Sequence, residues 1–148
     1  MKLFPDIPYV PSAEERCKIM FALAEVNPGA KTIDLGSGDG RVVIGMARRG
    51  AEAYGIEIEP KRVKLSRDNL KKARLEERAQ IIQASFWDID LSSFDIITLY
   101  GISSIMKRLE NKLQRELKIG TRVVSNYFEF PVWKPVRMQN HVYLYIKE

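Results

Sequence analysis

The chain has 148 residues, of which 45% are hydrophobic and 29% charged, and its formal net charge is +5. This length suits one domain, residues 1–148, with a single core, and it leaves no room for a separate substrate domain. The single cysteine cannot form an internal disulfide, and one histidine cannot complete a Cys/His zinc cluster, so we expect no metal.

The sequence favours a cytoplasmic protein without a membrane partner. No stretch approaches the roughly 20 apolar residues of a membrane span, and prolines interrupt the start, MKLFPDIPYVP, where a signal peptide needs an apolar run. The positive charge raises the question of an acidic partner such as RNA. The segments EPKRVKLSRDNLKKARLEER and IMKRLENKLQREL mix both signs, however, which is typical of solvated helix faces.

The first part of the chain, residues 1–27, is predicted to form a strap and a helix that cover the site of the following core, residues 28–148. Ser12 and Glu15 have the spacing of a capping box, in which each side chain bonds a free backbone N–H at a helix start. We expect this helix to reach about Val26, where NPGA interrupts it.

Strands and helices alternate through the first part of the core. The predicted strands are KTIDL, EAYGIEI, AQIIQA and FDIITLY. Between them we expect two helices. The first follows the glycine-rich loop and ends at Gly50, and the second is long and runs from Pro60 to about Glu77. The helix after the fourth strand, from about Ser104, carries a buried stripe of Met106, Leu109, Leu113 and Leu117.

After Gly120 the pattern changes, because TRVVSNYFEF, KPVRMQ and HVYLYIK are strands without helices between them. Alternation followed by strands alone predicts an α/β fold: a Rossmann-like, doubly wound and mostly parallel sheet. Helices cover both faces, and an antiparallel hairpin finishes one edge.

The stretch TIDLGSGDGR lies between a predicted strand and a predicted helix, where nucleotides bind in such sheets. Its glycines, Gly36, Gly38 and Gly40, occur at every second position, whereas a dinucleotide-binding loop has the spacing G-x-G-x-x-G. Glu57 follows at the end of the next strand, where a carboxylate can accept hydrogen bonds from ribose hydroxyls.

The charges of this loop favour a cationic cofactor. Asp34 and Asp39 flank the start of the helix and would repel a pyrophosphate. S-adenosyl-L-methionine carries a ribose and two cationic groups, a sulfonium and an ammonium. It therefore suits two acids better than a cofactor with a pyrophosphate does. Glycines would let the backbone lie close to this cofactor. We therefore predict an S-adenosylmethionine site.

The loop resembles the first motif of class I S-adenosylmethionine-dependent methyltransferases, acid-x-G-x-G-x-G. The resemblance implies a seven-stranded sheet with an antiparallel last strand, ribose binding by Glu57, and an adenine flanked by Ser85 and Phe86. The family usually has Asp or Asn where this chain has Ser85. The predicted cofactor site then consists of Asp34, Gly36, Ser37, Gly38, Asp39, Gly40, Glu57, Ile58, Ser85, Phe86 and Tyr100.

The acceptor of the methyl group is indicated by the end of the fourth strand. Family members that methylate planar amines carry Asp/Asn-Pro-Pro-Tyr there, whereas this chain has Tyr100 followed by Gly-Ile-Ser. An aromatic ring suits a lysine, whose methylene stem packs against it while the nitrogen approaches the sulfonium.

A narrower resemblance spans almost the whole chain. IPYVPSAEE, DLGSGDGR and KLQRELKIGTRVVSNYFEFPVWKP are similar to archaeal broad-specificity protein-lysine methyltransferases and their mitochondrial relatives. In that family the Tyr-Val-Pro segment lies by the cofactor and acceptor site, which would place Tyr9, Val10 and Pro11 against the substrate. The alternative is an apolar strap that only packs on the core.

The acceptor site is predicted from residues at strand ends. We expect Tyr9 and Tyr100 to orient the amine, and Ser125 and Asn126 to add acceptors, with no residue required as a base. Three functions remain open at this stage. The first is methylation of protein lysines, the second is methylation of RNA or a small molecule, and the third is non-catalytic binding of the cofactor.

Overall fold

A computed structural model describes residues 13–148 of the chain. Its helices are α1 (Ala13–Ala24), α2 (Arg41–Arg48), α3 (Pro60–Lys72) and α4 (Met106–Glu116), with a short 3-10 turn η1 (Phe86–Asp88). Its strands are β1 (Lys31–Leu35), β2 (Glu52–Glu57), β3 (Ala79–Gln83), β4 (Ile96–Tyr100), β5 (Arg122–Asn126), β6 (Arg137–Gln139) and β7 (Val142–Ile146).

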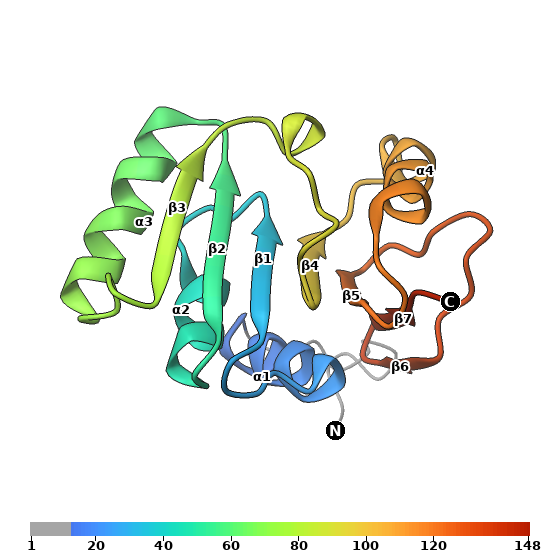
Figure 1. The fold of residues 1–148 in the computed structure, drawn as a ribbon, viewed down its shortest axis with the longest axis horizontal. Helices are drawn as coiled ribbons and strands as arrows, with labels where there is room; N and C mark the ends of the chain where they lie inside the picture. The colour runs from blue at the N-terminus through green and yellow to red at the C-terminus, as the bar shows by residue number, and fades with distance from the viewer. Residues whose placement is uncertain (1–12) are drawn as a thin grey trace, which may run out of the picture.

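These strands form one sheet in the order β3-β2-β1-β4-β5-β7-β6 (Figure 1). The strands from β3 to β5 pair in parallel, whereas β7 pairs antiparallel with both β5 and β6. The predicted doubly wound sheet with an antiparallel C-terminal hairpin is therefore confirmed. The strand order reverses between β1 and β4, which is where ligands bind in sheets of this kind.

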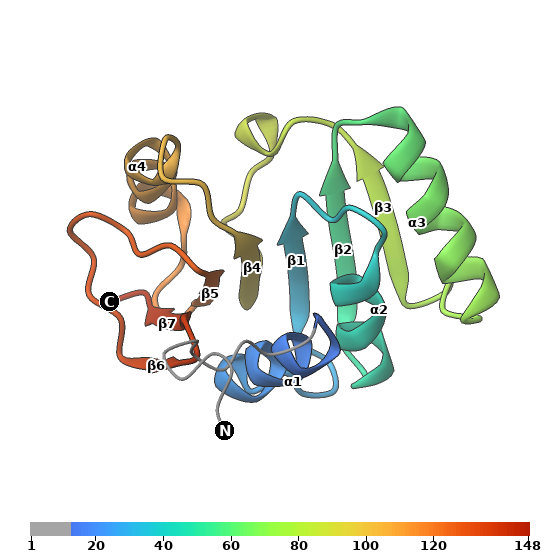
Figure 2. The same ribbon diagram turned by 180° about the vertical axis from the view of Figure 1, so that it is seen from behind.

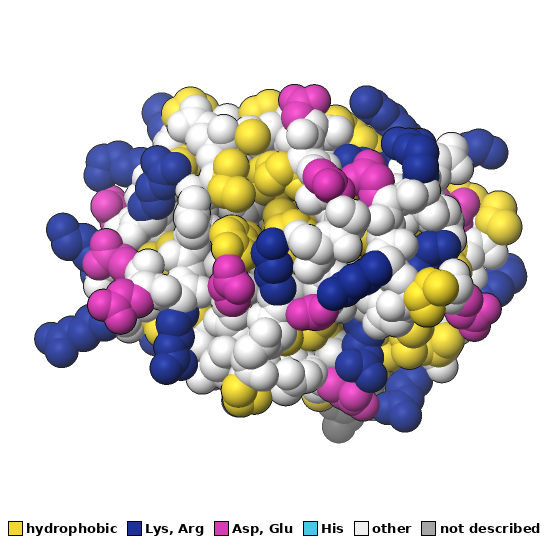
Figure 3. All heavy atoms as spheres, viewed as in Figure 1, with side chains coloured by type: hydrophobic (Ala, Val, Ile, Leu, Met, Phe, Trp, Pro, Cys, Tyr) yellow, Lys and Arg dark blue, Asp and Glu magenta, His cyan; other side chains and the backbone are white. Residues whose placement is uncertain are grey.

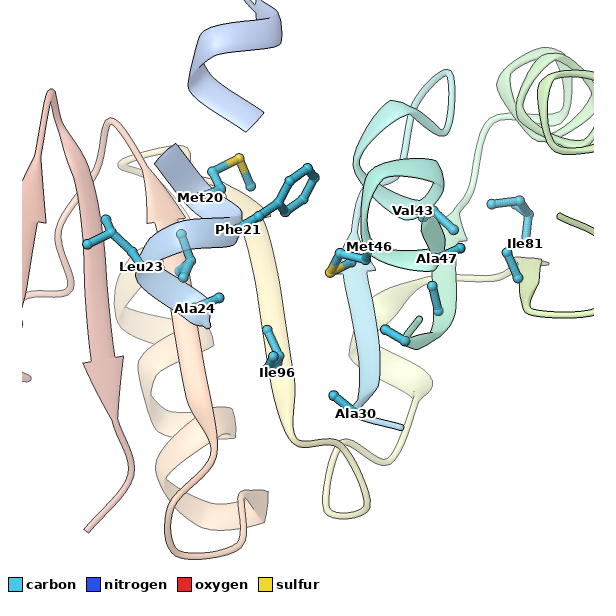
Figure 4. Packing of buried hydrophobic residues seen from close by; sticks show 14 of the residues in the cluster. Met20, Phe21, Leu23, Ala24, Ala30, Val43, Met46, Ala47, Ile81 and Ile96 are labelled. Atoms are coloured by element: carbon cyan, nitrogen blue, oxygen red, sulfur yellow. The ribbon is translucent and has the colours of Figure 1, made fainter. Parts of the chain in front are cut away.

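Helices cover both faces of the sheet. On one face, α1, α2 and α3 bury side chains that include Phe21, Met46 and Leu70. On the other face, α4 and η1 cover a cluster that includes Ile97 and Leu113. Helix α2 lies behind the sheet in Figure 1 and in front of it in Figure 2. Figure 4 shows the first cluster, with α1 and α2 facing each other across the ring of Phe21.

The predicted buried stripe of α4 is confirmed, because the exposed fractions of its four apolar side chains do not exceed 6%. The predicted end of α3 at about Glu77 is wrong, because the helix ends at Lys72. Arg74 takes a left-handed conformation with φ 57°, and the N–H of Leu75 donates to the carbonyl of Leu70 at 3.1 Å. This bond closes a Schellman motif, which usually has glycine at the left-handed position.

Among residues 13–148, no helix is both long and apolar enough to cross a bilayer. The same residues contain no group of three His, Cys, Asp or Glu side chains arranged to hold a metal ion. On the face shown in Figure 3, basic and acidic side chains alternate over the surface rather than forming a block of one sign. This distribution agrees with the mixed charges of the helical segments.

Candidate active site

The glycine-rich loop lies at the carboxyl end of β1, against β2. The backbone N–H groups of Gly36 and Ser37 both donate to the carbonyl of Ile56, at 2.9 and 3.0 Å. Gly36 and Gly38 have φ of 82° and 56°, and a Cβ atom at either position would meet no described atom within 4 Å. The loop therefore presents bare backbone to open space, as the sequence predicts for a cofactor-binding loop.

Gly40 has another role. It precedes α2 with φ 87°, and a Cβ atom there would lie 3.0 Å from Cβ of Ser66 in α3. Ser66 is fully buried. A glycine is therefore needed at residue 40 because α3 packs closely against the loop, and the prediction that this position leaves room for the cofactor is not supported by its surroundings.

A cleft of about 290 Å³ opens where the strand order reverses. It is lined by Met20, Asp34, Gly36, Ser37, Gly38, Asp39, Arg41, Val42, Tyr100 and Asn126. The fold thus brings together seven of the residues predicted to bind the cofactor or the substrate, from β1, the loop, β4 and β5. The sequence did not indicate Met20, Arg41 or Val42, because their places in the cleft depend on how α1 and α2 pack.

Asp34 is buried, with an exposed fraction of 6%. One of its oxygens, Oδ1, accepts a hydrogen bond from the Thr98 hydroxyl at 2.7 Å. The pKa of this carboxyl is raised to about 7, mainly by burial; the Thr98 hydrogen bond lowers it, and the nearby acids Asp39 and Glu57 raise it. An ammonium group in the cleft would stabilise the ionised form.

Asp39 contributes less negative charge than its sequence position indicates. The Arg41 guanidinium donates to both its carboxylate oxygens, from Nη2 to Oδ2 at 2.6 Å and from Nε to Oδ1 at 3.1 Å. These hydrogen bonds hold the pKa of Asp39 below its usual value. Because the charge of Asp39 is paired, the inference that two acids select a cationic cofactor depends mainly on Asp34.

Glu57 is buried at the end of β2 and already holds the loop. Its Oε1 accepts from the Gly38 N–H at 2.9 Å, and its Oε2 accepts from the Glu59 N–H at 3.0 Å. A carboxylate has about four acceptor sites, so both oxygens retain capacity for ribose hydroxyls. The next residue, Ile58, has an exposed fraction of 66% and offers an apolar surface beside this carboxylate.

Ser85 and Phe86 follow β3 and do not line the cleft. The Ser85 hydroxyl caps η1 by accepting from the Trp87 N–H at 3.3 Å. The Phe86 ring packs against Trp87, with 4.7 Å between the ring centroids. Both residues lie on the face covered by α4, and their contact with adenine remains a prediction.

The predicted acceptor residues separate into three groups. Tyr100 and Asn126 line the cleft from the ends of β4 and β5. Ser125 does not: it is fully buried, and its hydroxyl donates to the carbonyl of Phe128 at 2.7 Å. Neighbouring side chains of a strand point to opposite faces, so Ser125 cannot share the orientation of Asn126. Tyr9, Val10 and Pro11 lie outside the described residues.

Two polar atoms in the cleft have no hydrogen-bond partner among residues 13–148. They are the hydroxyl of Ser37 and Oδ1 of Asn126, both from side chains that are at least 95% buried. Buried polar atoms are rarely left without partners, so each of these two needs a water molecule or a ligand group as its partner. Together with Asp34 and the bare glycine loop, they fit a cofactor that carries an ammonium and several polar groups.

A larger groove of about 720 Å³ lies between α1, α2 and α3 and shares only Asp39 and Arg41 with the cleft. Its wall includes Lys18, Arg48 and Lys72. The smaller cleft is the candidate site, because it lies at the strand ends where the order reverses and contains the glycine loop.

A parallel sheet with an antiparallel last pair, a bare glycine loop and an acid at the end of β2 define the Rossmann-like methyltransferases that use S-adenosylmethionine. Residues 34–137 match the model of the ANTKMT methyltransferase domain. The chain belongs to this family and is an S-adenosylmethionine-dependent methyltransferase.

Two relatives and one solved structure illustrate the similarity. The protein-lysine N-methyltransferase of Saccharolobus islandicus is 35% identical, over 99% of this chain and 97% of its own. The adenine nucleotide translocase lysine N-methyltransferase of Mus musculus is 34% identical over 88% of this chain, which spans 57% of that protein. The crystal structure of an RNA methyltransferase from Salinibacter ruber with S-adenosyl-L-homocysteine is 36% identical, with a TM-score of 0.86, over 94% and 95% of the two chains.

Proposed function

We propose that this enzyme transfers a methyl group from S-adenosylmethionine to the side-chain amine of lysines in proteins. The observation that carries the proposal is the free Oδ1 of Asn126, a buried acceptor in the cleft beside Asp34 and Tyr100. The descriptions of the Saccharolobus and Mus relatives as lysine methyltransferases support the same acceptor.

The surroundings of Asn126 fix which atom of its amide is free. Nδ2 donates to the carbonyl of Leu99 at 3.3 Å and lies 3.0 Å from Sδ of Met20. A carbonyl can only accept, so the amide nitrogen must face Leu99, and Oδ1 is the amide atom left without a partner among residues 13–148. An acceptor at this position can hold one N–H of a neutral amine and thereby orient the nitrogen lone pair.

The amine must lose a proton before it can attack. A free lysine has a pKa of about 10.4, so forming the neutral amine at pH 7 costs about 4.6 kcal/mol. Removal of the ammonium from water and its approach to a second cation both lower its pKa, so the proton can leave to solvent. No side chain of the cleft is then required as a base.

The remaining catalytic contribution is positioning. When bound, S-adenosylmethionine supplies a methyl group activated by its sulfonium. We assign Asp34 to the cofactor ammonium, Glu57 to the ribose, and Gly36 and Gly38 to the close approach of backbone. Ser37 offers its hydroxyl. Holding two reactants in line can supply about 7 to 11 kcal/mol of the barrier.

The test is transfer of labelled methyl from S-adenosylmethionine to the proteins of a whole-cell lysate, with acid hydrolysis to identify methylated lysine. We expect label on lysine. Asn126→Leu should lower turnover about 100-fold, because the N–H of the reacting amine loses its acceptor. Cofactor affinity should stay within a few-fold. Asn27→Ala, an exposed asparagine at the opposite ends of the strands, is the matched control.

A second candidate substrate is RNA. The Salinibacter ruber protein, 36% identical to this chain, is described as an RNA methyltransferase. The formal net charge of +5 also favours a phosphate-bearing partner. Total RNA in a parallel reaction separates the two: label on RNA and none on protein would refute the lysine proposal, and label on neither would refute both acceptors.

A further inference from the structure

Tyr127 occupies a strained turn directly after β5. Its φ is 68°, and the N–H of Phe128 donates to the carbonyl of Asn126 at 2.9 Å, which closes a three-residue γ-turn around it. A γ-turn with positive φ is rare and strained, and a tyrosine is poorly suited to it. Strained backbone of this kind is concentrated at functional sites.

The turn places the Tyr127 ring between a cation and a second ring. The Arg16 guanidinium lies 3.9 Å from the centroid of the Tyr127 ring. The Tyr100 ring lies on the cleft wall with its centroid 5.2 Å from that of Tyr127, at an interplanar angle of 51°. Helix α1, the end of β4 and the end of β5 therefore meet in a continuous stack, Arg16–Tyr127–Tyr100.

The stack is anchored by backbone carbonyls of the turn between β6 and β7. Arg16 is 7% exposed, and its Nη1 donates to the carbonyl of Asn140 at 3.2 Å. The N–H of Tyr127 donates to the carbonyl of His141 at 2.7 Å. Asn140 and His141 form the turn between β6 and β7, so this hairpin holds both Arg16 and Tyr127 in place.

Tyr100 is held but not covered. Its exposed fraction is 60%, and the side chains of Ile102, two residues later, and Phe128, which follows Tyr127, are also exposed, at 55% and 37%. An exposed aromatic ring at the mouth of a cleft, beside a buried acceptor, suits a guest with an apolar stem and a polar end.

On the basis of the proposed function, we propose that the Tyr100 ring, with Tyr127 packed behind it, forms an aromatic wall for the methylene stem of the substrate lysine. Arg16 is the positioning residue that fixes this wall. The buried guanidinium covers one face of Tyr127, so Tyr127 in turn sets the direction of the Tyr100 ring. The Oδ1 of Asn126, register partner of Tyr100, then receives the nitrogen at the end of the stem.

The test uses the protein that the enzyme labels most strongly in the lysate, purified, as the substrate in steady-state assays. Tyr127→Phe keeps the ring and should leave KM within about three-fold of wild type. Tyr127→Leu should raise KM about ten-fold, as expected when a well-packed aromatic contact is lost. The cofactor Kd, measured by calorimetry, should stay within two-fold for both, because Tyr127 does not line the cleft.

Tyr127→Gly distinguishes this role from a purely structural one. Glycine accepts positive φ without strain, so this variant should keep its thermal unfolding midpoint and still show the raised KM. A KM that is unchanged in both Tyr127→Leu and Tyr127→Gly would overturn the proposal. A cofactor Kd that changed in parallel with KM would also overturn it, since the effect would then be on the whole cleft.

Arg16 is tested in the same assay. Arg16→Lys keeps the charge but loses the planar group, so it should raise KM about as much as Arg16→Met. Lys18→Met, an exposed position of the same helix, is the control. Absence of any protein methylation by the wild type would refute the proposed function itself, whereas an active wild type with indifferent Arg16 and Tyr127 variants would refute only the wall.

Discussion

The Thr98 hydroxyl donates to Oδ1 of Asp34 across the central strand pair of the sheet, at 2.7 Å. The two residues are register partners in β1 and β4, so the strand pairing itself places the Thr98 hydroxyl beside the Asp34 carboxyl. This bond favours the ionised carboxyl, but burial opposes it more strongly and leaves the pKa of Asp34 at about 7. Near neutral pH, the acid therefore responds to small changes of proton or ligand concentration.

Cofactor affinity should fall as pH decreases through about 7. The Asp34 carboxyl must be ionised to pair with an ammonium, and below its raised pKa it takes up a proton. We expect Kd to rise about ten-fold for each unit of pH below this value, as for a single titrating group. Calorimetry between pH 5 and 7.5 measures it, and Asp34→Asn should bind weakly with little pH dependence. An equally steep dependence in that variant would contradict the assignment.

The same carboxyl should reduce folding stability at high pH. Its folded pKa, about 7, lies above the unfolded value of about 3.8, so its contribution to stability is fully present below pH 3.8 and is lost as pH rises through 7. Asp34→Asn cannot ionise and keeps an acceptor for Thr98. Its unfolding free energy should exceed that of wild type by up to roughly 4 kcal/mol at pH 8, and by much less at pH 4. Urea titrations at both pH values compare the two proteins.

Glu57→Gln should weaken cofactor binding about 10- to 100-fold, by loss of a charge-assisted acceptor for two hydroxyls. The variant also loses one of the two acceptors now used by Gly38 and Glu59. Glu52→Gln, at the other end of β2, provides the control. Equal affinities of the two variants would show that the carboxylate does not contact the cofactor.

Lys112→Met should destabilise the fold by about 3 kcal/mol. The Lys112 ammonium is buried, pairs with Glu116 at 2.7 Å, and donates to the carbonyl of Ile89 at 2.7 Å. Its removal leaves the Glu116 carboxylate with only the longer ion pair to the exposed Arg115, at 3.8 Å. Adding Glu116→Leu should recover much of the loss, because an absent pair costs less than a broken one. Lys107→Met, exposed on the same helix, should change the denaturation midpoint little.

Gly45→Ala should lower the unfolding midpoint by roughly 5 °C, corresponding to about 2 kcal/mol. A Cβ atom at Gly45 would lie 2.4 Å from the ring of Phe21, so α1 would have to move away from α2. Phe21→Leu in the same chain should restore part of the midpoint by freeing that space. Calorimetric scans of the wild type and the two variants test this packing.

The sequence predicted the architecture well because the elements carry local signals. The period of apolar residues identifies α4 and its buried stripe, and short apolar runs bounded by turn residues identify the strands. The predicted end of α3 was wrong because Arg74 adopts the left-handed conformation that glycine usually provides. An arginine in the sequence gives no signal that a helix ends there.

The site was predictable only where backbone chemistry dictated it. Gly36, Gly38 and Asp34 belong to one continuous segment, so their motif predicts their proximity. Arg16 and Tyr127 meet only because α1 packs against β5 and β7, and no local pattern encodes that contact. Pairing of Asp39 with Arg41 could have been anticipated, because the two residues are separated by only one position.

The central strand pair also determines when the cleft can exist during folding. Pairs β1–β2 and β2–β3 join segments that are close in sequence, whereas Thr32 of β1 pairs with Ile96 of β4 across a long intervening chain. Closing so long a loop costs more conformational entropy than forming a strand pair between segments close in sequence. We therefore expect this seam, the β1–β4 strand pair, to form late in folding. Because the cleft lies on that seam, the cofactor can bind only a completed sheet. Added ligand should therefore slow unfolding without accelerating the early steps of refolding.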